Sequence, residues 1–453
     1  MLSFVVLSIL LGIGHILRMK VTLFRKLYLP SSVIGGIIGL IILQSADYFS
    51  NPVPEVYTAS WGKLPGVLIN IVFACLFLGV TIPKVSKLWK TTWKQLAYGQ
   101  IVAWGQYVVG IGLFLAFIQF IWPEISNVFG VVLPVGFEGG HGTAGGLIPV
   151  FEGKGWAAGA DFALTSATAG IISAIVMGMV LVNWAIRKGH VSRYKTPDST
   201  VEDDSIGIIP IQKRPSAGRL SVNGDVIETF SLHLVIVAVA ILLGYLMKEG
   251  LLLIQEAVPV IEKYDLFSGF PLFPLCMLGG LFIQLWAEKY DSHKVIDLGL
   301  MRRIQNCALD YLIVSAIAMI KLTVVLQGII PLLILVVGGI LWNVFCVTVV
   351  ARRVFKTAWF ERAIAEMGQS MGVTATGLLL LRVVDPDYET EAAEAFASKQ
   401  LLHEPIMGGG LWTGIAIPLT FAVGPWPVFG ITVGALVFWF TVLAVHAFIM
   451  SRQ

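Results

Sequence analysis

Apolar residues run through this chain in long blocks, separated by shorter polar connections. A block of about 20 apolar residues is long enough to cross the roughly 30 Å hydrocarbon core of a bilayer as one helix. The pattern therefore predicts membrane-spanning helices over residues 2–18, 30–46, 65–82, 96–121, 157–186, 229–254, 270–287, 305–326, 329–351, 391–422 and 427–450.

Composition supports a polytopic membrane protein and excludes an ordinary soluble one. Of the 453 residues, 57% are hydrophobic and only 13% are charged, with a mean hydropathy of +0.83, so too little polar surface is available for a soluble domain of this size. The positive charge after residue 17 follows the first apolar block, which favours a retained helix over a cleaved signal peptide. The cysteines have neither metal-like nor disulfide-like spacing, and we expect them to be packing residues: Cys75, Cys276, Cys307 and Cys346.

Basic residues alternate between successive loops, and this predicts orientation. The loop after the first span carries Arg18 and Lys20, whereas the next loop sets Lys63 against Asp47 and Glu55. Because cytoplasmic loops are enriched in Lys and Arg, the alternation predicts an N-terminus outside and a C-terminus inside.

Short motifs recur in order along the two halves of the chain. Pro30, Gly35 and Gly36 match Pro274, Gly279 and Gly280, while "TAGGLI" at 143–148 matches "TATGLL" at 374–379. The loop charges place the halves in opposite directions, which is the inverted-repeat architecture of many secondary transporters. We expect an all-α fold with two inverted repeats of about five spans and an extra C-terminal helix. The boundaries are 1–186, a cytoplasmic linker at 187–228, 229–423, and 424–453.

Two glycine-rich stretches interrupt the apolar pattern, one in each half. "GFEGGHGTAGGLIPVF" lies at 136–151 and "EMGQSMGVTATGLLLLR" at 366–382. Non-helical backbone is tolerated at membrane depth where it is buried in protein or lines a wet cavity. We expect re-entrant hairpins over about 130–150 and 362–382 that meet at a central site. The alternative is a pair of interfacial loops with tight turns.

The motif "GGHGTAGG", at Gly139 to Gly146, resembles the signature of the bacterial sodium/glutamate symporter family, and "MGQSMGVTATG" is similar to that family's second motif. The resemblance implies sodium-coupled uptake of L-glutamate or a related anionic amino acid by alternating access. It also implies a homodimer with a moving core and a fixed scaffold in the bacterial inner membrane. The extra apolar segment at 429–450 departs from the family's ten-span pattern.

The candidate site combines hydroxyls and backbone at the two loops with ionisable groups in the later span. Sodium prefers oxygen ligands, and its candidates are Asp161, Thr143, Thr374 and Ser370. Substrate-binding candidates are Gly140, His141, Gly142, Thr143, Ser370, Gly372, Thr374, Thr376, Lys399 and His403. Asp161 is equally an interfacial cap, Arg382 is a candidate that can instead snorkel to the inner surface, and Lys399, His403 and Glu404 can pair with one another.

Several functions remain open at this point. Within transporters, the alternatives are another carboxylate as substrate or protons as the coupling ion. A channel fits opposed hairpins less well than a gated site does, and an enzyme would require a nucleophile with its base or a metal cluster. We therefore expect no enzymatic activity, no cofactor besides the coupling ion, and no nucleic-acid partner.

Overall fold

The computed structural model describes residues 1–27, 29–82, 85–192, 209, 211, 214–265, 267–386 and 388–451. Within these ranges all regular elements are helical and no strand occurs. Most of the acidic part of the predicted linker, including "EDDS" at 202–205, lies outside the described residues.

In the part of the chain that the structure describes, seven helices are long and apolar enough to cross a bilayer, so the prediction of an all-α, multi-pass protein is confirmed. These candidate spans are Leu2–Lys20, Ser31–Tyr48, Thr92–Ile121, Ala158–Arg187, Thr229–Ala257, Ile329–Val354 and Pro425–His446. The other predicted spans correspond to helices that are shorter or more polar.

The predicted span over 391–422 is wrong as one continuous helix. It consists of α22 (Ala392–His403) and α23 (Leu411–Val423), separated by a non-helical segment. Pro405 and the glycines Gly408 and Gly409, whose φ angles are +59° and +102°, explain the break, because proline lacks an amide donor and positive φ leaves the helical region. Likewise, the helix predicted over 65–82 ends at Ala74. The span predicted over 305–326 is also not one helix, because residues 319–321 separate α16 (Leu298–Ala318) from α17 (Leu322–Gln327).

The described chain folds into two compact units, and each draws on both halves of the sequence. Unit 1 comprises Met1–Ile82, Gly145–Gly153 and Asp198–Lys321, and unit 2 comprises Pro83–Ala144, Lys154–Pro197 and Leu322–Gln453. Unit 1 contains α1 (Leu2–Lys20), α2 (Thr22–Lys26), α3 (Ser31–Tyr48), α4 (Glu55–Thr58), α5 (Leu64–Ala74), α10 (Ile148–Gly153), α13 (Thr229–Ala257), α14 (Pro259–Tyr264), α15 (Phe273–Tyr290) and α16 (Leu298–Ala318).

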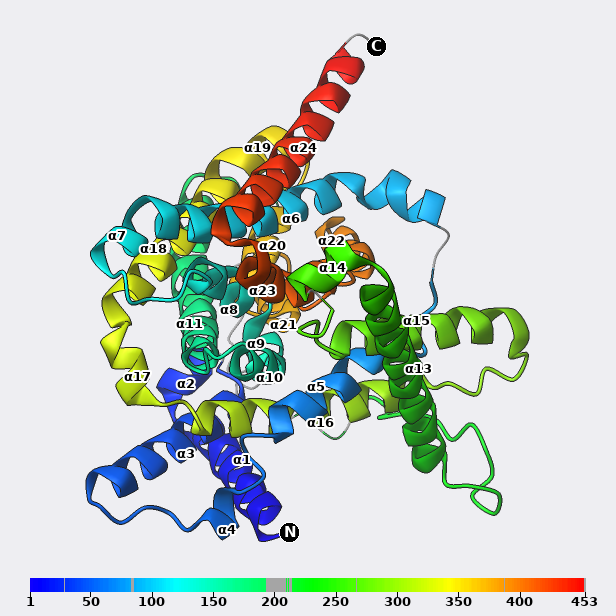
Figure 1. The fold of residues 1–453 in the computed structure, drawn as a ribbon. Helices are drawn as coiled ribbons and strands as arrows, with labels where there is room; N and C mark the ends of the chain where they lie inside the picture. The colour runs from blue at the N-terminus through cyan, green and yellow to red at the C-terminus, as the bar shows by residue number, and fades with distance from the viewer. Residues whose placement is uncertain are drawn as a thin grey trace. The chain divides into compact units, whose positions relative to one another are not determined.

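Glycines set the close helix crossings of unit 1. α1 packs against α3, and α13 packs against α15 (Figure 1). A Cβ added at Gly14 would lie 2.2 Å from the Ser31 carbonyl oxygen, and one at Gly279 would lie 2.3 Å from the Ala240 carbonyl oxygen. Small residues let helix backbones approach closely in a membrane, where packing rather than hydrophobicity drives association.

The Gly35–Gly36 and Gly279–Gly280 pairs each face two helices. A Cβ added at Gly35 would lie 2.6 Å from the carbonyl oxygen of Leu10 in α1, whereas the second glycine of each pair faces another helix. A Cβ at Gly36 of α3 would approach Ile317 of α16, while one at Gly280 of α15 would lie 2.2 Å from the carbonyl oxygen of Ala74 in α5. Each Gly-Gly pair therefore packs against two helices at once.

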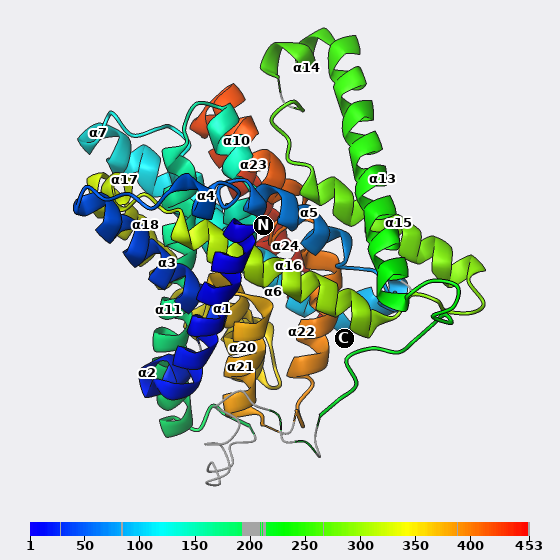
Figure 2. The same ribbon diagram turned by 90° about the horizontal axis from the view of Figure 1, so that it is seen from below.

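Unit 2 is built around longer helices with local defects. Its elements are α6 (Val85–Leu113), α7 (Gln119–Ile121), α8 (Val132–Phe137), the first residues of α9 (Gly140–Gly146), α11 (Ala158–Arg187), α17 (Leu322–Gln327), α18 (Ile329–Phe345), α19 (Ala351–Val354), α20 (Trp359–Met371), α21 (Thr374–Val384), α22, α23 and α24 (Pro425–Ser451). Two π-helical segments, Phe114–Ile118 and Cys346–Val350, continue α6 and α18. α20 and α21 lie side by side (Figure 2), and such closely packed short helices position the residues described next.

Candidate functional site

The two glycine-rich loops approach each other inside unit 2. Gly140, at the start of α9, has a φ of +65°, and a Cβ added there would lie 3.2 Å from the carbonyl oxygen of Gly372, between α20 and α21. Glycine is therefore favoured at position 140 both by its backbone conformation and by the space available.

A buried carboxylate lies beside this meeting point. Glu138 Oε1 is 2.7 Å from His403 Nε2 and accepts a hydrogen bond of 2.9 Å from Gln369 Nε2. The Glu138 and His403 side chains are almost completely shielded from solvent. Gln369 belongs to α20 and His403 to α22, while Glu138 directly follows the last residue of α8.

Surrounding amides orient His403. The Trp104 indole N–H donates to Gln100 Oε1 over 2.8 Å, so the Gln100 amide N–H₂ faces His403 Nδ1 at 3.1 Å. Because Nδ1 then accepts, the ring proton sits on Nε2 and is donated to Glu138 in the neutral imidazole. Glu138 therefore keeps its partner without requiring a charged histidine.

A second buried pair lies next to the first. Lys399 Nζ is 2.6 Å from Glu366 Oε1, and both side chains are fully buried. Lys399 also donates to Gln369 Oε1 and Gln400 Oε1, at 3.1 and 2.9 Å. Gln369 consequently bridges the two pairs, because its amide donates to Glu138 and its carbonyl accepts from Lys399.

The network extends from there to the α20–α21 loop. The Gln400 amide donates to Thr374 Oγ1 at 2.8 Å and to Glu404 Oε1 at 3.0 Å. On another side, Gln95 Nε2 donates to Glu366 Oε2 at 3.0 Å. Buried charges are costly unless they are paired and hydrogen-bonded, and this network meets much of that requirement.

Some acceptors remain unpaired. The Thr168 hydroxyl donates to the Leu164 carbonyl and accepts from His141 Nε2 at 2.9 Å, which leaves His141 Nδ1 as an acceptor. Among the described residues, the buried acceptor atoms without a hydrogen-bond partner include Glu138 Oε2, His141 Nδ1 and Gln106 Oε1. An unmade buried hydrogen bond costs about 1–3 kcal/mol, so a cation or an ammonium group would be favourable there.

Comparison with known proteins decides the family. The profile of the sodium/glutamate symporter family matches residues 1–389 of this chain. The chain belongs to this family. It is therefore a multi-pass membrane symporter that couples glutamate to sodium, and not an enzyme. No curated protein matches the chain.

Within this symporter, the predicted site residues fall into two groups. The network and the loop contacts bring together Gly140, Gly372, Thr374, Lys399 and His403. The others have partners outside this network. Thr143 Oγ1 lies 3.5 Å from the Gly408 carbonyl oxygen and Ser370 donates to Asn343 Oδ1, while Gly142 and Thr376 belong to α9 and α21.

Asp161 lies apart from these groups along α11. It is buried in the first turn of that helix, seven residues before Thr168, which corresponds to about 10 Å along the axis. Among the described residues no group of three His, Cys, Asp or Glu side chains suits a metal ion, so a sodium site here would use carbonyls and hydroxyls as well.

Sequence reasoning missed the members of the network that pair with the predicted ones. Pairing of Lys399, His403 and Glu404 with one another is one alternative that the sequence leaves open, but the charged partners of Lys399 and His403 are Glu366 and Glu138. A signal existed in the amides that interrupt apolar stretches, namely Gln95, Gln100, Gln106, Asn343, Gln369 and Gln400. Such residues inside spans usually face other polar groups.

Proposed function

We propose that the buried network of unit 2 is the site where this symporter binds sodium and L-glutamate, or a related anionic amino acid, during alternating access. The observation that carries the proposal is the set of unpaired, buried acceptors beside the point where the two loops approach. Glu138 is central, because its Oε1 is doubly paired while its Oε2 has no partner among the described residues.

The chemistry of an amino acid suits this arrangement. An ammonium group or a sodium ion would pair with Glu138 Oε2. Gln106 Oε1 is a further candidate ligand, because the Gln106 amide donates to the carbonyl of Ser370, the residue after Gln369. The carboxylates would interact with Lys399 and with the first amide groups of α21 at Thr374, which have no partner inside the helix. Lys399 now pairs with Glu366, and substrate would compete for that charge.

An inverted repeat is supported by corresponding positions in the two halves. Thr143 and Thr374 begin matching motifs 231 positions apart. The same offset relates Glu138 to Gln369, which hydrogen-bond to each other. The π-helical segments that begin at Phe114 and Cys346 are related by nearly the same offset. These pairs favour re-entrant hairpins at about 130–150 and 362–382 whose tips meet.

We propose the following arrangement of repeats, membrane orientation and subunits. The repeats occupy 1–186 and 229–423, joined by the linker at 187–228, and residues 424–453 add a final helix. The protein sits in a bacterial inner membrane with its N-terminus outside and its C-terminus inside, and it works as a homodimer. The alternating basic loops support the orientation.

Uptake into proteoliposomes tests the coupling and the substrate. We expect accumulation of labelled L-glutamate under an inward sodium gradient, and loss of accumulation when choline replaces sodium. Counterflow against a panel of amino and dicarboxylic acids would reveal a different carboxylate as the better substrate. Uptake that responds only to a pH gradient would instead assign proton coupling and contradict the proposal.

Conservative changes at the two loops test whether they share one site. Replacing Thr143 or Thr374 with Val removes a hydroxyl, and each change is expected to weaken sodium or glutamate dependence about tenfold to a hundredfold. The double variant should be non-additive because groups around one ligand couple. Unchanged dependence in the double variant would remove the loops from the site.

A further inference from the structure

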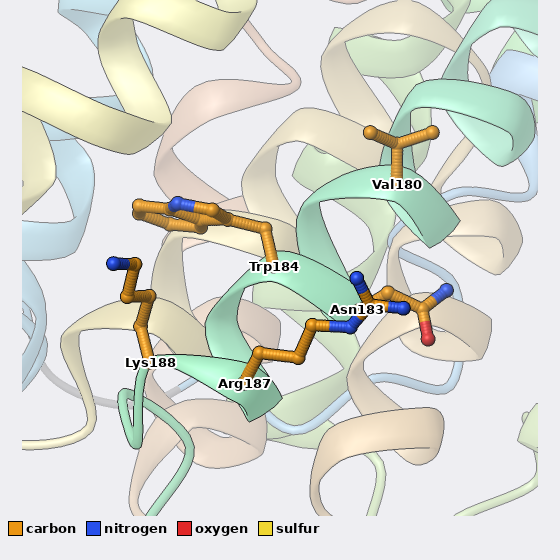
Figure 3. A pocket seen from close by; sticks show the side chains of 5 residues that line it. All are labelled: Val180, Asn183, Trp184, Arg187 and Lys188. Carbon is orange, nitrogen blue, oxygen red and sulfur yellow. The ribbon is translucent and has the colours of Figure 1, made fainter.

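A groove opens at the C-terminal end of α11, away from the buried network. It encloses about 480 Å³ and is lined by Val180, Asn183, Trp184, Arg187 and Lys188 (Figure 3). Every lining residue comes from the last turns of one helix or directly follows it. The groove combines an aromatic ring, an amide and two cationic side chains, with Lys188 extending beside Trp184 and Arg187 extending toward Asn183 (Figure 3).

An apolar stripe leads along α11 to this groove. Ile172, Val176 and Val180 are 37%, 46% and 54% exposed and follow each other at intervals of four residues, so they lie on one face of the helix. Such a face on a candidate span is suited to acyl chains. The transition to Asn183, Trp184 and Arg187 within two turns is typical of the boundary between hydrocarbon and headgroups.

The charge at this end is positive and lacks carboxylate partners. Among the described residues, neither Arg187 nor Lys188 forms an ion pair. The Arg352 guanidinium adds a third cation, stacked 5.1 Å from the Trp184 ring and 4.8 Å from the Trp359 ring. Partial burial, followed by the charges of Arg352 and Lys188, lowers the pKa of His190 just beyond the helix, so histidine adds little positive charge of its own.

We propose that this groove binds the headgroup of an anionic phospholipid, with its phosphate at Arg187, the rest of the headgroup extending toward Lys188, and an acyl chain along Ile172, Val176 and Val180. A phosphate accepts charge-assisted hydrogen bonds from guanidinium and ammonium groups. The apolar stripe distinguishes a lipid from a free phosphate ion, because an inorganic anion gains nothing from it. Basic pockets beside spans are suited to such headgroups. The inference does not depend on the substrate site.

Native mass spectrometry of the purified full chain tests the site with dioleoyl phosphatidylglycerol. We expect the double variant Arg187→Gln/Lys188→Gln to bind this lipid at least tenfold more weakly than the unchanged protein. The matched control is Arg302→Gln/Arg303→Gln, which removes two exposed charges from α16, and it should bind normally. Val180→Trp leaves the charge unchanged but fills the groove, so it should also reduce binding.

The outcomes separate the possible sources of binding. Phosphatidylcholine with the same acyl chains should bind more weakly than phosphatidylglycerol, and millimolar inorganic phosphate should not displace the bound lipid. Equal loss in the Arg302/Arg303 control, or normal binding by Val180→Trp, would show that the groove is not the site. Displacement by inorganic phosphate would assign the groove to a free anion and overturn the lipid proposal.

Discussion

The interiors of the two units differ most in their buried charge. Among the described residues, every buried Asp, Glu, Lys and Arg belongs to unit 2: Glu138, Asp161, Glu361, Arg362, Glu366, Asp385 and Lys399. Unit 1 buries mainly apolar side chains around Ala74, Val237 and Met301, with a second cluster around Leu7 and Val314. The interior of unit 1 is therefore mainly apolar, whereas the interior of unit 2 contains buried charged groups.

This difference in buried charge indicates that the two units have different roles in transport. The glycine crossings of unit 1 bring backbones so close that even a methyl group does not fit, which favours a fixed arrangement of helices. Unit 2 bears the desolvation cost of ions and still has unpaired acceptors, which suits groups that exchange partners when a ligand arrives. We propose that unit 1 is the scaffold and unit 2 carries the transport site.

The largest effect is expected from breaking the Lys399–Glu366 pair. Lys399→Met leaves the Glu366 carboxylate buried without its cation, and removal of one partner from a buried pair costs about 3–5 kcal/mol. We expect a large fall in thermal stability in detergent and loss of sodium-driven glutamate uptake. The double variant Lys399→Met/Glu366→Gln removes both charges and should recover most of the stability while uptake stays lost. Recovered uptake would show that the pair is only structural.

A second variant tests ligand binding with little effect on folding. Glu138→Gln retains an acceptor for His403 and Gln369 but removes the negative charge. We expect about a hundredfold weaker apparent affinity for sodium or glutamate, equivalent to about 2.7 kcal/mol, measured by the concentration dependence of uptake. The control is Glu361→Gln, another buried carboxylate of unit 2, which accepts from the Ser192 amide. An equal loss of affinity in this control would contradict a specific role of Glu138 in binding sodium or glutamate.

Apolar periodicity predicted the helical class and the regions of all seven candidate spans, because membrane burial depends on local composition. It did not predict the break between α22 and α23, since the surrounding residues remain apolar and the break depends on Pro405 and the following glycines. The interleaving of the chain between the two units also depends on long-range packing that no local pattern contains.

The candidate site was predictable where a residue is chemically unusual in its context. Lys399 and His403 are conspicuous inside an apolar stretch, even though the family match ends before them, at residue 389. Their partners were not predicted, because Glu366 lies 33 positions from Lys399 and Glu138 lies 265 positions from His403. Nothing in the sequence distinguishes these two carboxylates from the others of the chain as partners. Pairing is a property of the fold.

Two alanine substitutions in α1 test the fixed character of unit 1. At Gly14 a methyl group would clash with the Ser31 carbonyl, whereas a Cβ at Gly12 meets nothing within 4 Å. We expect Gly14→Ala to destabilise the protein by about 1–3 kcal/mol and Gly12→Ala to leave stability equal or slightly higher. Thermal unfolding measures this, and the sodium affinity of both variants should match the unchanged protein. A changed sodium affinity in Gly14→Ala would contradict the division of work between the units.

The smallest effect is expected at the edge of unit 2, where the exposed Glu391 pairs with the largely buried Arg362 outside the candidate spans. The Thr357 hydroxyl and the Arg362 guanidinium, 2.6 and 2.7 Å from Glu391, lower the pKa of its carboxyl below the ordinary value. Because the folded-state pKa is the lower one, the contribution to stability is present above the unfolded pKa and is lost as the pH falls through the folded pKa. Glu391→Gln should therefore cost less than about 1 kcal/mol at neutral pH, and the difference from the unchanged protein should vanish in acid. Glu394→Gln, an exposed change on α22, serves as the control and should show no such pH dependence. A cost at Glu391 that persists unchanged in acid would mean that its charge is not what stabilises this edge.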